Sequence, residues 1–276
     1  MESFNGRVAA ITGAGSGIGR ALAVELARRG APLALVDVDE GGLAETVGRC
    51  EGYGVKVTSQ RLDVAERDAV FAWADQVVED HGRVNVIVNN AGVSLSATVE
   101  AMEHDDLEWL LAINLGGVVA GTQAFLPHLK AAGEGHVVNL SSVFGLLSIP
   151  TQSAYNASKF AVRGFTDALR MELEIEGSPV SCTTVHPGGI KTNIVRNGRQ
   201  HHSVATMGGE ATDAHARFDQ LALTTPDKAA RQILAAVQKG RRRVLVGPDA
   251  KVLDVVSRLP ASWYQGVIVR GARRRA

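Results

Sequence analysis

Short apolar runs alternate with longer amphipathic segments along most of this chain. The runs are rich in Val, Ile, Leu and Ala and end at Gly, Asp, Asn or Ser, which is typical of strands in a buried parallel sheet. The segments between them follow the spacing of helices. Seven strands are predicted in this way, near residues 7–12, 32–37, 55–60, 84–89, 135–141, 179–186 and 243–246. The alternation predicts a doubly wound parallel α/β sheet, with helices on both faces and ligands beyond the carboxyl ends of the strands.

The pattern contains no repeat, no low-complexity linker and no second apolar core, so one domain over residues 1–276 is predicted. The stretch 193–225 is polar, contains several Gly and His residues, and would be a long connection without structure of its own. We expect a substrate lid there, with a short exposed helix as the alternative. Residues 249–276 form a C-terminal extension.

A glycine-rich turn, TGAGSGIG, joins the first predicted strand to the first predicted helix. Gly13, Gly17 and Gly19 remove side chains where the backbone would turn sharply and approach a pyrophosphate, and the helix start offers free N–H groups. The spacing G-x-x-x-G-x-G fits neither the G-x-G-x-x-G fingerprint nor a P-loop. Its place between strand and helix predicts a dinucleotide site of the Rossmann type.

Asp37 ends the second predicted strand, 24 residues after Gly13. A dinucleotide fold places an acid about there to hold the adenosine ribose, and its charge would repel a 2′-phosphate. NAD is therefore favoured over NADP. The alternative is that Asp37 begins a turn or caps the next helix, a task that Asp39 could perform instead.

Tyr155 and Lys159 lie four residues apart, so a helix would place them on one face. A free tyrosine has a pKa of about 10, and bringing it near 7 requires roughly 4 kcal/mol, which a lysine and a second cation could share. Such a pair would act as a general acid or base. The spacing alone occurs by chance in many helices, so it does not carry the assignment by itself.

Several motifs in this order resemble the classical short-chain dehydrogenase/reductase family, and the resemblance runs along nearly the whole chain. They are TGAGSGIG at 12–19, Asp63 after the third strand, NNAG at 89–92, Asn114, Ser142, Tyr155 with Lys159, and PGGIKT at 187–192. The resemblance implies an oxidoreductase that acts on CH–OH groups with a nicotinamide cofactor, as a homotetramer or dimer. Relatives that prefer NADP commonly carry an arginine where this chain has Val38.

The resemblance also implies residue roles. Tyr155 would exchange the proton, Lys159 would lower its pKa and bind the nicotinamide ribose, and Ser142 would orient the carbonyl. Ser141 is the rival, but strand alternation would turn the two serines in opposite directions. Asn114 would hold a water beside the lysine, with a hydrogen-bonded core amide as the alternative. The predicted cofactor residues are Gly13, Ser16, Gly17, Ile18, Gly19, Asp37, Asp63, Val64, Asn90, Ala91, Gly92, Tyr155, Lys159, Pro187, Gly188, Ile190 and Thr192.

Asn89 and Gly92 are expected to support the backbone under the cofactor, and Thr192 to bind the nicotinamide carboxamide or, alternatively, to cap a helix. The predicted substrate residues are Ser94, Ser142, Val143, Leu147, Gln152 and Tyr155, with Leu95 and Leu146 as further candidates. The apolar segment VFGLLSI predicts a hydrophobic secondary alcohol or ketone, although these residues could equally pack in the core. A 3-oxoacyl thioester reductase is the nearer alternative, and a catalytically silent NAD-binding protein the more distant one.

Composition indicates which binding partners, disulfides and metal sites to expect. Lys plus Arg equals Asp plus Glu, at 29 each, which argues against general binding of nucleic acid. Two cysteines, Cys50 and Cys182, are too few for a disulfide framework. No leader pattern precedes the first strand and no apolar run suggests a membrane span, so a cytoplasmic protein is expected. The adjacent His201 and His202 lack the spacing of a helical zinc pair, and no metal site is predicted.

The C-terminal stretch LDVVSRLPASWYQGVIV precedes RGARRR, so apolar and aromatic residues are followed by four arginines. Such a segment could touch an anionic membrane. Packing against a subunit neighbour, followed by a solvated tail, is the commoner arrangement and is the one the sequence favours.

Overall fold

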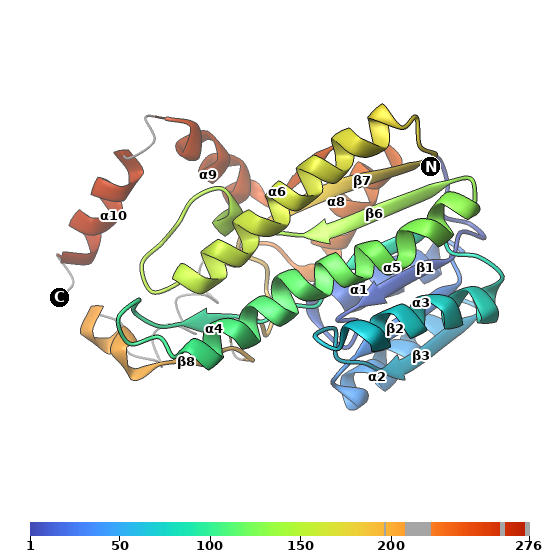
Figure 1. Cartoon of the computed structure of the whole chain (residues 1–276), viewed down its shortest axis with the longest axis horizontal. Coiled ribbons are helices and arrows are strands. Elements are labelled where there is room, and N and C mark those ends of the chain that lie inside the picture. The colour runs from blue at the N-terminus through green and yellow to red at the C-terminus, as the bar shows by residue number, and fades with distance from the viewer. Residues whose placement is uncertain (196, 208–221, 260–262, 274–276) are drawn as a thin grey trace.

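The computed structural model describes residues 1–195, 197–207, 222–259 and 263–273 (Figure 1). A seven-stranded parallel sheet forms its centre, as predicted, with the strand order β3-β2-β1-β4-β6-β7-β9. These strands are β1 (Ala9–Thr12), β2 (Leu33–Asp37), β3 (Val57–Arg61), β4 (Val86–Asn89), β6 (Gly135–Leu140), β7 (Val180–Pro187) and β9 (Arg243–Val246). The helices nearest to them are α1 (Gly17–Arg28), α2 (Glu40–Glu51), α3 (Arg67–His81), α5 (Gly117–Ala131), α6 (Ser153–Ile175) and α8 (Pro226–Gln238).

The strand order reverses at β1, where β2 and β4 pair on opposite sides with the same residues, Ala9 to Ile11. The chain first builds outward from β1 to β2 and β3, and then crosses to β4 and builds in the other direction. A crevice at the carboxyl ends of the strands forms at such a switch point, and ligands of doubly wound sheets bind there. The glycine turn after β1 and the NNAG segment after β4 meet at this point.

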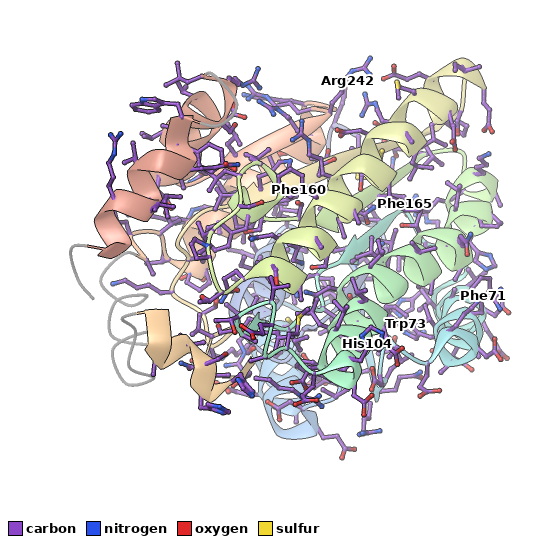
Figure 2. The ribbon with its side chains drawn as sticks, turned by 60° about the vertical axis from the view of Figure 1, so that its left-hand side comes forward. Phe71, Trp73, His104, Phe160, Phe165 and Arg242 are labelled. Carbon is purple, nitrogen blue, oxygen red and sulfur yellow. The ribbon has the colours of Figure 1, made fainter. Side chains whose placement is uncertain are left out.

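Both faces of the sheet are apolar, which explains why the strands read as nearly continuous hydrophobic runs. Ile11 and Leu35 face the layer of α1 and α8, whereas Ala10 and Val36 face the layer of α3, α5 and α6. In the second layer Trp73 meets Phe125 edge to face, with ring centroids 4.9 Å apart. Figure 2 shows Trp73 beside the green helix that contains α5, and it shows Phe160 and Phe165 on α6. Cys50 and Cys182 are buried free thiols, one in each layer.

One long helix runs from α4 (His104–Leu111) through the π-turn η1 (Ala112–Gly116) into α5. By length and composition, the helix from His104 to Ala131 could cross a membrane. The sequence analysis predicted no membrane span, and the helix begins with charged residues. Half of its most apolar stretch is buried inside the protein, and α5 packs on α3, β4 and β6. The buried apolar face is therefore that of a core helix.

A second, two-stranded parallel sheet joins β5 (Leu95–Ser96) to β8 (Arg199–Gln200). It attaches the first part of the predicted lid to the segment after the NNAG loop, and a 3-10 turn, η3 (His202–Met207), follows it. Residues 196 and 208–221 of the predicted lid lie outside the described residues. The described residues 197–207 of the predicted lid therefore contain a strand and a 3-10 turn.

The chain ends in two helices beyond β9, α9 (Pro248–Arg258) and α10 (Trp263–Arg273). Asp254 of α9 binds Arg243 of β9 at 2.8 Å and holds α9 on the sheet edge. In Figure 1, α10 is the dark red helix at the left edge, beyond α9 and away from the sheet. Residues 260–262 and 274–276 of the predicted C-terminal extension lie outside the described residues.

Candidate active site

The glycine turn between β1 and α1 requires its glycines. Gly13 and Gly17 have φ values of 65° and 53°, which disfavour residues with a Cβ atom. A Cβ atom on Gly19 would lie 2.0 Å from the Gly13 carbonyl oxygen, so the helix can approach the turn only without a side chain there. This is the close backbone geometry that a pyrophosphate needs.

The start of α1 is open to an anion. Ser16 is its N-cap residue but makes no capping hydrogen bond with its side chain, and no acidic residue lies in the first turn. The first N–H groups and the positive end of the helix dipole therefore face outward without a negative partner from this helix turn. These features fit the phosphates of a dinucleotide.

The NNAG segment is fastened to the end of β1 by Thr12, a residue that the motif analysis did not single out. The Thr12 hydroxyl accepts the N–H groups of Asn90 and Ala91 at 3.0 and 3.1 Å. The Asn90 amide donates to the carbonyls of Thr12 and Gly13 at 3.0 and 2.9 Å. These bonds hold the two loops of the switch point together. A threonine directly before the first glycine is the signal that could have identified Thr12.

Asp37 lies against the glycine turn. Its carboxylate accepts the N–H of Gly15 at 2.7 Å and the N–H of Asp39 at 2.9 Å. Asp39, not Asp37, caps α2 by accepting the N–H of Gly42 at 3.0 Å. The nearby Arg20 donates to the Gly15 carbonyl and pairs with Glu45 at 2.8 Å, so its charge is already matched. Asp37 therefore presents a carboxylate beside the turn without a basic partner of its own.

Asp63 and Val64 follow β3 on the same side of the sheet. Asp63 accepts the N–H of Ala65 at 2.9 Å and is partly exposed, whereas Val64 is buried against α5. A Cβ atom on Gly117 would lie 2.7 Å from a Val64 methyl group, so this glycine lets the helix accept the valine. Neither residue lines the cavity described below, so their contact with the cofactor stays a prediction.

Ser142, Tyr155 and Lys159 converge at the carboxyl end of β6. Tyr155 and Lys159 lie on one face of α6, and the Lys159 ammonium is 5.5 Å from the centroid of the Tyr155 ring. The Tyr155 hydroxyl forms a side-chain hydrogen bond with Ser142. All three side chains are less than 10% exposed. The sequence separated them by up to 17 positions, and the fold brings them into one cluster.

The electrostatics of this cluster are dominated by burial. Burial raises the pKa of Tyr155 to about 12, and the hydrogen bond with Ser142 opposes this rise. Burial also lowers the pKa of Lys159 to about 8. The Lys159 ammonium donates to the Leu140 carbonyl at 3.0 Å. In the protein alone, burial therefore sets the direction of the Tyr155 pKa shift, and a lowering by Lys159 together with a bound cofactor stays a prediction.

Asn114 lies in the π-turn η1 and is completely buried. Its amide oxygen accepts the Val93 N–H at 2.8 Å, and its amide nitrogen donates to the Val93 carbonyl at 2.9 Å and to Ser158 at 3.2 Å. A Cβ atom on Gly92 would lie 3.2 Å from the Asn114 oxygen and 3.5 Å from the Lys159 nitrogen. Asn114 thus fixes the loop after NNAG next to the lysine, and the core-amide alternative describes its contacts.

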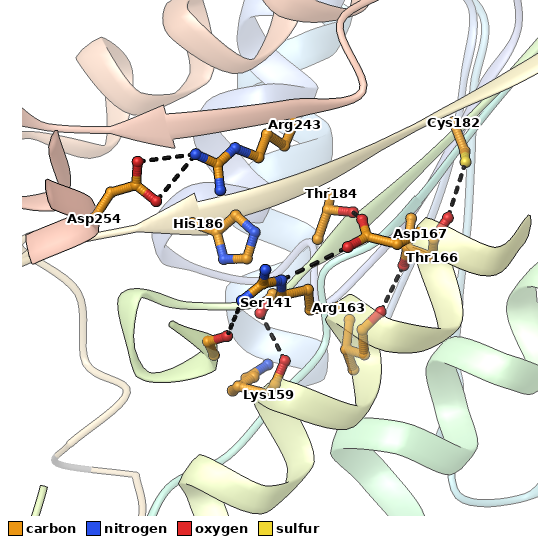
Figure 3. Close-up of polar contacts among 12 residues, drawn as sticks. Ser141, Lys159, Arg163, Thr166, Asp167, Cys182, Thr184, His186, Arg243 and Asp254 are labelled. Atoms are coloured by element: carbon orange, nitrogen blue, oxygen red, sulfur yellow. Dashed lines mark hydrogen bonds and ion pairs between the residues drawn. The ribbon is translucent and has the colours of Figure 1, made fainter. Parts of the chain in front are cut away.

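The two serines that follow β6 make different contacts, and both line the cavity described below. Ser141 donates to the Lys159 carbonyl at 2.8 Å and ties β6 to α6 (Figure 3). The Ser142 hydroxyl accepts the Phe144 N–H at 3.1 Å at the start of the turn η2 (Val143–Gly145). The backbone carbonyl of Ser142 accepts a hydrogen bond from Nδ1 of His186 at 2.9 Å. His186 is completely buried, and its Nε2 has no partner.

The segment after β7 forms the opposite wall. Thr192 approaches the glycine turn, since a Cβ atom on Gly17 would lie 3.1 Å from its methyl group. Thr192 caps no described helix, so the alternative reading of this residue is wrong. Asp249, in the first turn of α9, accepts the Gly189 N–H at 2.6 Å. Its second oxygen is buried without a partner. An acid directly after the last strand was the available signal for Asp249.

A cavity of about 490 Å³ lies between these walls. Leu147 and the alternatives Leu95 and Leu146 do not line it; all three are buried against other parts of the fold. The lining residues are Ile18, Asn90, Gly92, Ser94, Ser96, Leu140, Ser141, Ser142, Val143, Phe144, Ile149, Thr151, Gln152, Tyr155, Lys159, Pro187, Gly188, Gly189, Ile190, Thr192, Ile194, Val195, Asp249 and Leu253.

A small polar group interrupts the apolar wall of this cavity. The Gln152 amide donates to the Ser96 hydroxyl at 2.5 Å, and Ala97 donates its N–H to the Thr151 carbonyl at 2.9 Å. Thr151 has a φ of 65°, which is unusual for a β-branched residue. Such strain persists where the surroundings fix it, and here it orients the start of α6.

Side-chain contacts fasten the first part of the predicted lid to the rest of the fold. Arg199 pairs with Asp106 at 2.6 Å, and its guanidinium lies 3.9 Å from the centroid of the Trp109 ring. Ser94 donates to the Ile194 carbonyl at 2.9 Å. Further along, the rings of His201 and His202 stack at 4.0 Å, and the described residues contain no group of three ligating side chains that could hold a metal.

Comparisons with known proteins agree with this geometry. The family model described as short chain dehydrogenase matches residues 7–203. The Mycobacterium tuberculosis protein named "Putative oxidoreductase SadH" is 51% identical over 276 residues, which cover 99% of this chain and 98% of that protein.

Two solved structures show the same fold with different nicotinamide cofactors. A short chain dehydrogenase/reductase from Burkholderia phymatum in complex with NAD is 30% identical, with a TM-score of 0.86 and coverage of 98% of this chain and 97% of that chain. An alcohol dehydrogenase from the archaeon Thermococcus sibiricus, complexed with 5-hydroxy-NADP, is 26% identical, with a TM-score of 0.72 and coverage of 86% and 94%.

Proposed function

The chain belongs to the short-chain dehydrogenase family, and from this premise we propose that it transfers hydride between NAD and a hydrophobic secondary alcohol or its ketone. One observation carries the proposal: Ser142, Tyr155 and Lys159 converge on a cavity that opens between the glycine turn and the segment after β7. The oxidoreductase assignment follows from the family. The substrate, the cofactor preference and the residue roles are what we propose.

Tyr155 is the proton donor for ketone reduction and the proton acceptor for alcohol oxidation. Ser142 stabilises the charge that develops on the substrate oxygen, because its hydroxyl shares a hydrogen bond with the phenol. A bound NAD would supply the hydride acceptor and, in its oxidised form, a positive charge beside the phenol. That charge favours the phenolate, which burial otherwise disfavours.

Lys159 serves two tasks in this scheme. With a pKa of about 8, it is largely protonated at neutral pH and adds a positive charge near the Tyr155 ring. Its ammonium also lies beside Gly92, on the wall where the nicotinamide ribose would bind. Asn114 keeps this wall in place through its bonds to Val93, and a water held beside the lysine would complete a proton path.

NAD is the proposed cofactor for two reasons. Asp37 brings a negative charge to the glycine turn, and Arg20, the nearest guanidinium on that turn, is already bonded to Gly15 and Glu45. Val38 is exposed and offers no positive charge to a 2′-phosphate. The glycine turn, the uncapped start of α1 and Thr192 are the residues that would hold the dinucleotide.

The substrate class follows from the wall of the cavity. Val143, Phe144, Ile149, Ile194 and Leu253 are apolar, and they surround the reacting oxygen site on the side away from the glycine turn. Burying apolar substrate surface against them provides binding energy of about 25 cal/mol per Å². A polyol would leave its hydroxyls without partners there, except near Gln152 and Ser96.

Turnover of secondary alcohols and ketones of graded size and polarity, with NAD(H) and NADP(H) in parallel, tests the proposal. We expect NAD-linked activity that increases with substrate hydrophobicity. Activity only with NADPH and a 3-oxoacyl thioester would favour that alternative instead. Tight binding of NAD without turnover of any substrate in the panel would favour the silent NAD-binding protein.

A further inference from the structure

The two C-terminal helices carry an unusual concentration of exposed apolar side chains. Of the thirteen large hydrophobic residues that are exposed in the described part of the chain, six lie between residues 252 and 269. We call these six the C-terminal ridge. They are Val252, Val255, Leu259, Trp263, Val267 and Val269.

On α9 the ridge lies opposite the face that holds the helix to the protein. Asp254 and the completely buried Ala250 face inward, with Asp254 bound to Arg243 at 2.8 Å. Val252 and Val255 are 62% and 60% exposed. The orientation of α9 is thus fixed by an ion pair, and the apolar exposure is not a consequence of a loosely placed helix.

On α10 the exposed apolar side chains project from more than one side of the helix, since Val269 follows Val267 by two positions. Trp263 and Val267 are one helical turn apart, and both are about half exposed. The Tyr264 hydroxyl accepts the N–H of Ser148 at 3.3 Å, and the next residue, Ile149, lines the cavity. The helix at the edge of the molecule in Figure 1 is therefore in contact with the loop that forms one wall of the site.

The charged side chains of this region are all positive. From Val255 to Ala276 the sequence contains five arginines, no lysine and no acidic residue, although the whole chain carries 29 residues of each sign. Arg258 is paired with Asp254, whereas Arg270, at the end of the ridge, is exposed. Three further arginines, Arg273, Arg274 and Arg275, follow in the sequence.

We propose that the C-terminal ridge docks this protein on an anionic lipid surface. Trp263 and the valines enter the boundary between headgroups and acyl chains, and the arginines contact the phosphates. Each basic residue near an anionic bilayer contributes about fivefold to the partition coefficient. The sequence alone favoured a subunit neighbour. A neighbouring subunit would need acidic side chains opposite the arginines. An anionic bilayer presents negatively charged headgroups over its whole surface.

The position of the ridge gives the docking a use. Leu253 of α9 lines the cavity from inside, while Val252 and Val255 lie on the outer side of the same helix. A lipophilic alcohol dissolved in the bilayer would reach the cavity past Ile149 and Leu253 without crossing water. This consequence rests on the proposed function, but the docking itself does not.

The test is flotation of the full-length protein with vesicles of phosphatidylcholine alone or mixed with phosphatidylglycerol, at low and high salt. We expect flotation only with phosphatidylglycerol, weakened by salt because the charges are exposed. Replacing Arg270, Arg273, Arg274 and Arg275 by Gln should reduce partitioning about fivefold for each arginine removed. Trp263→Ser should also reduce it, and Trp263 fluorescence should shift to the blue on binding.

Matched controls are available on the same chain. Arg241→Gln removes an exposed arginine and Ile175→Ser an exposed isoleucine, both away from the ridge, and neither should change flotation. Trp263→Phe identifies the fluorescence signal, since it leaves the contributions of the buried Trp73 and of Trp109, which is covered by Arg199, in place.

Absence of flotation with either vesicle overturns the proposal, as does equal flotation of the arginine variant. A smaller mass of the arginine variant in ultracentrifugation, without any vesicle binding by the parent, would assign the ridge to a second copy of the chain. Vesicle binding without alcohol dehydrogenase activity would leave the docking intact and contradict the proposed function only.

Discussion

Asp249 accepts the backbone N–H of Gly189 at 2.6 Å and joins the first turn of α9 to the segment after β7, which forms one wall of the cavity. The carboxylate lies so close to the backbone that a Cβ atom on Gly188 would be 2.1 Å from it. Its other oxygen is buried and has no partner. A residue of the C-terminal extension therefore fixes the loop that we propose to contact the cofactor.

Asp249→Ala should weaken NAD binding more than it weakens the fold. A hydrogen bond to a charged acceptor contributes about 1.5–3 kcal/mol, and its loss frees the loop at 188–190. Calorimetric titration with NAD measures the change in Kd. Asp227→Ala is the matched control, because Asp227 also follows a proline in the first turn of a helix but is exposed. An equal effect of both variants on Kd would contradict the role given to Asp249.

Tyr155→Phe should reduce turnover by about 10²–10⁴-fold, the range of general acid–base catalysis, while the Kd for NAD changes little. The phenyl ring keeps the edge-to-face contact with Phe144, at a centroid distance of 6.3 Å, so the site keeps its shape. Steady-state kinetics and NAD titration measure the two quantities. Tyr53→Phe, on the exposed surface, is the control. Full turnover by Tyr155→Phe would show that another group moves the proton.

The pKa of Tyr155 should fall when NAD⁺ binds. Burial raises it to about 12 in the protein alone, and a positive charge near the ring favours the phenolate. Alcohol oxidation needs the phenolate, so its rate should rise with pH up to the lowered pKa. The absorbance of tyrosinate, taken as the difference between the parent and Tyr155→Phe, gives the midpoint with and without NAD⁺. An unchanged midpoint would show that the positive charge of NAD⁺ does not lower the pKa of Tyr155.

Two buried histidines should make the protein sensitive to acid. Burial lowers the pKa of His186 to about 4 and that of His136 to about 3. The unfolded chain takes up these protons near pH 6.5 and the folded chain does not, so stability is complete above that pH and falls as the pH decreases toward 4. Each histidine contributes a slope of about 1.4 kcal/mol per pH unit in this window.

Urea unfolding at pH 7.5 and at lower pH measures this slope. His186→Asn keeps a donor for the Ser142 carbonyl but removes the titrating ring, so it should reduce the slope by about one proton. His104→Asn, at an exposed position, should leave the slope unchanged. A parent protein whose stability is constant between pH 6.5 and pH 4.5 would contradict the burial of these rings.

Val38→Arg should improve NADP binding by about tenfold, equivalent to about 1.4 kcal/mol, because a guanidinium would then lie next to Asp37 where a 2′-phosphate would bind. The position is half exposed, so the fold should tolerate the change. Titrations with NAD and NADP give the ratio of the two Kd values. Val99→Arg introduces the same charge at an exposed position elsewhere. If both variants bind NADP equally well, the effect is one of net charge and not of position.

The sequence by itself determined the sheet and the identity of the main chemical groups. Strands such as 32–37 and 179–186 were predicted within two residues of β2 and β7, because strands buried on both faces must be apolar along their whole length. The glycines of the first turn and the Tyr155–Lys159 pair were also readable, since their chemistry depends on residue type and short-range spacing. Strand alternation did not separate Ser142 from Ser141, because both residues lie beyond the end of β6 and both line the cavity.

Only the tertiary structure decided the contacts between distant segments. Gly189 and Asp249 are 60 positions apart, and β5 pairs with β8 across about a hundred residues. No local sequence pattern predicts either contact. Leu147 lies in an apolar segment that predicted the substrate wall, yet the turn η2 buries it elsewhere. The direction of the Tyr155 pKa shift depended on burial, which the spacing of Tyr155 and Lys159 in the sequence does not reveal. Burial and long-range pairing are properties of the packed chain, and the sequence encodes them only through the fold.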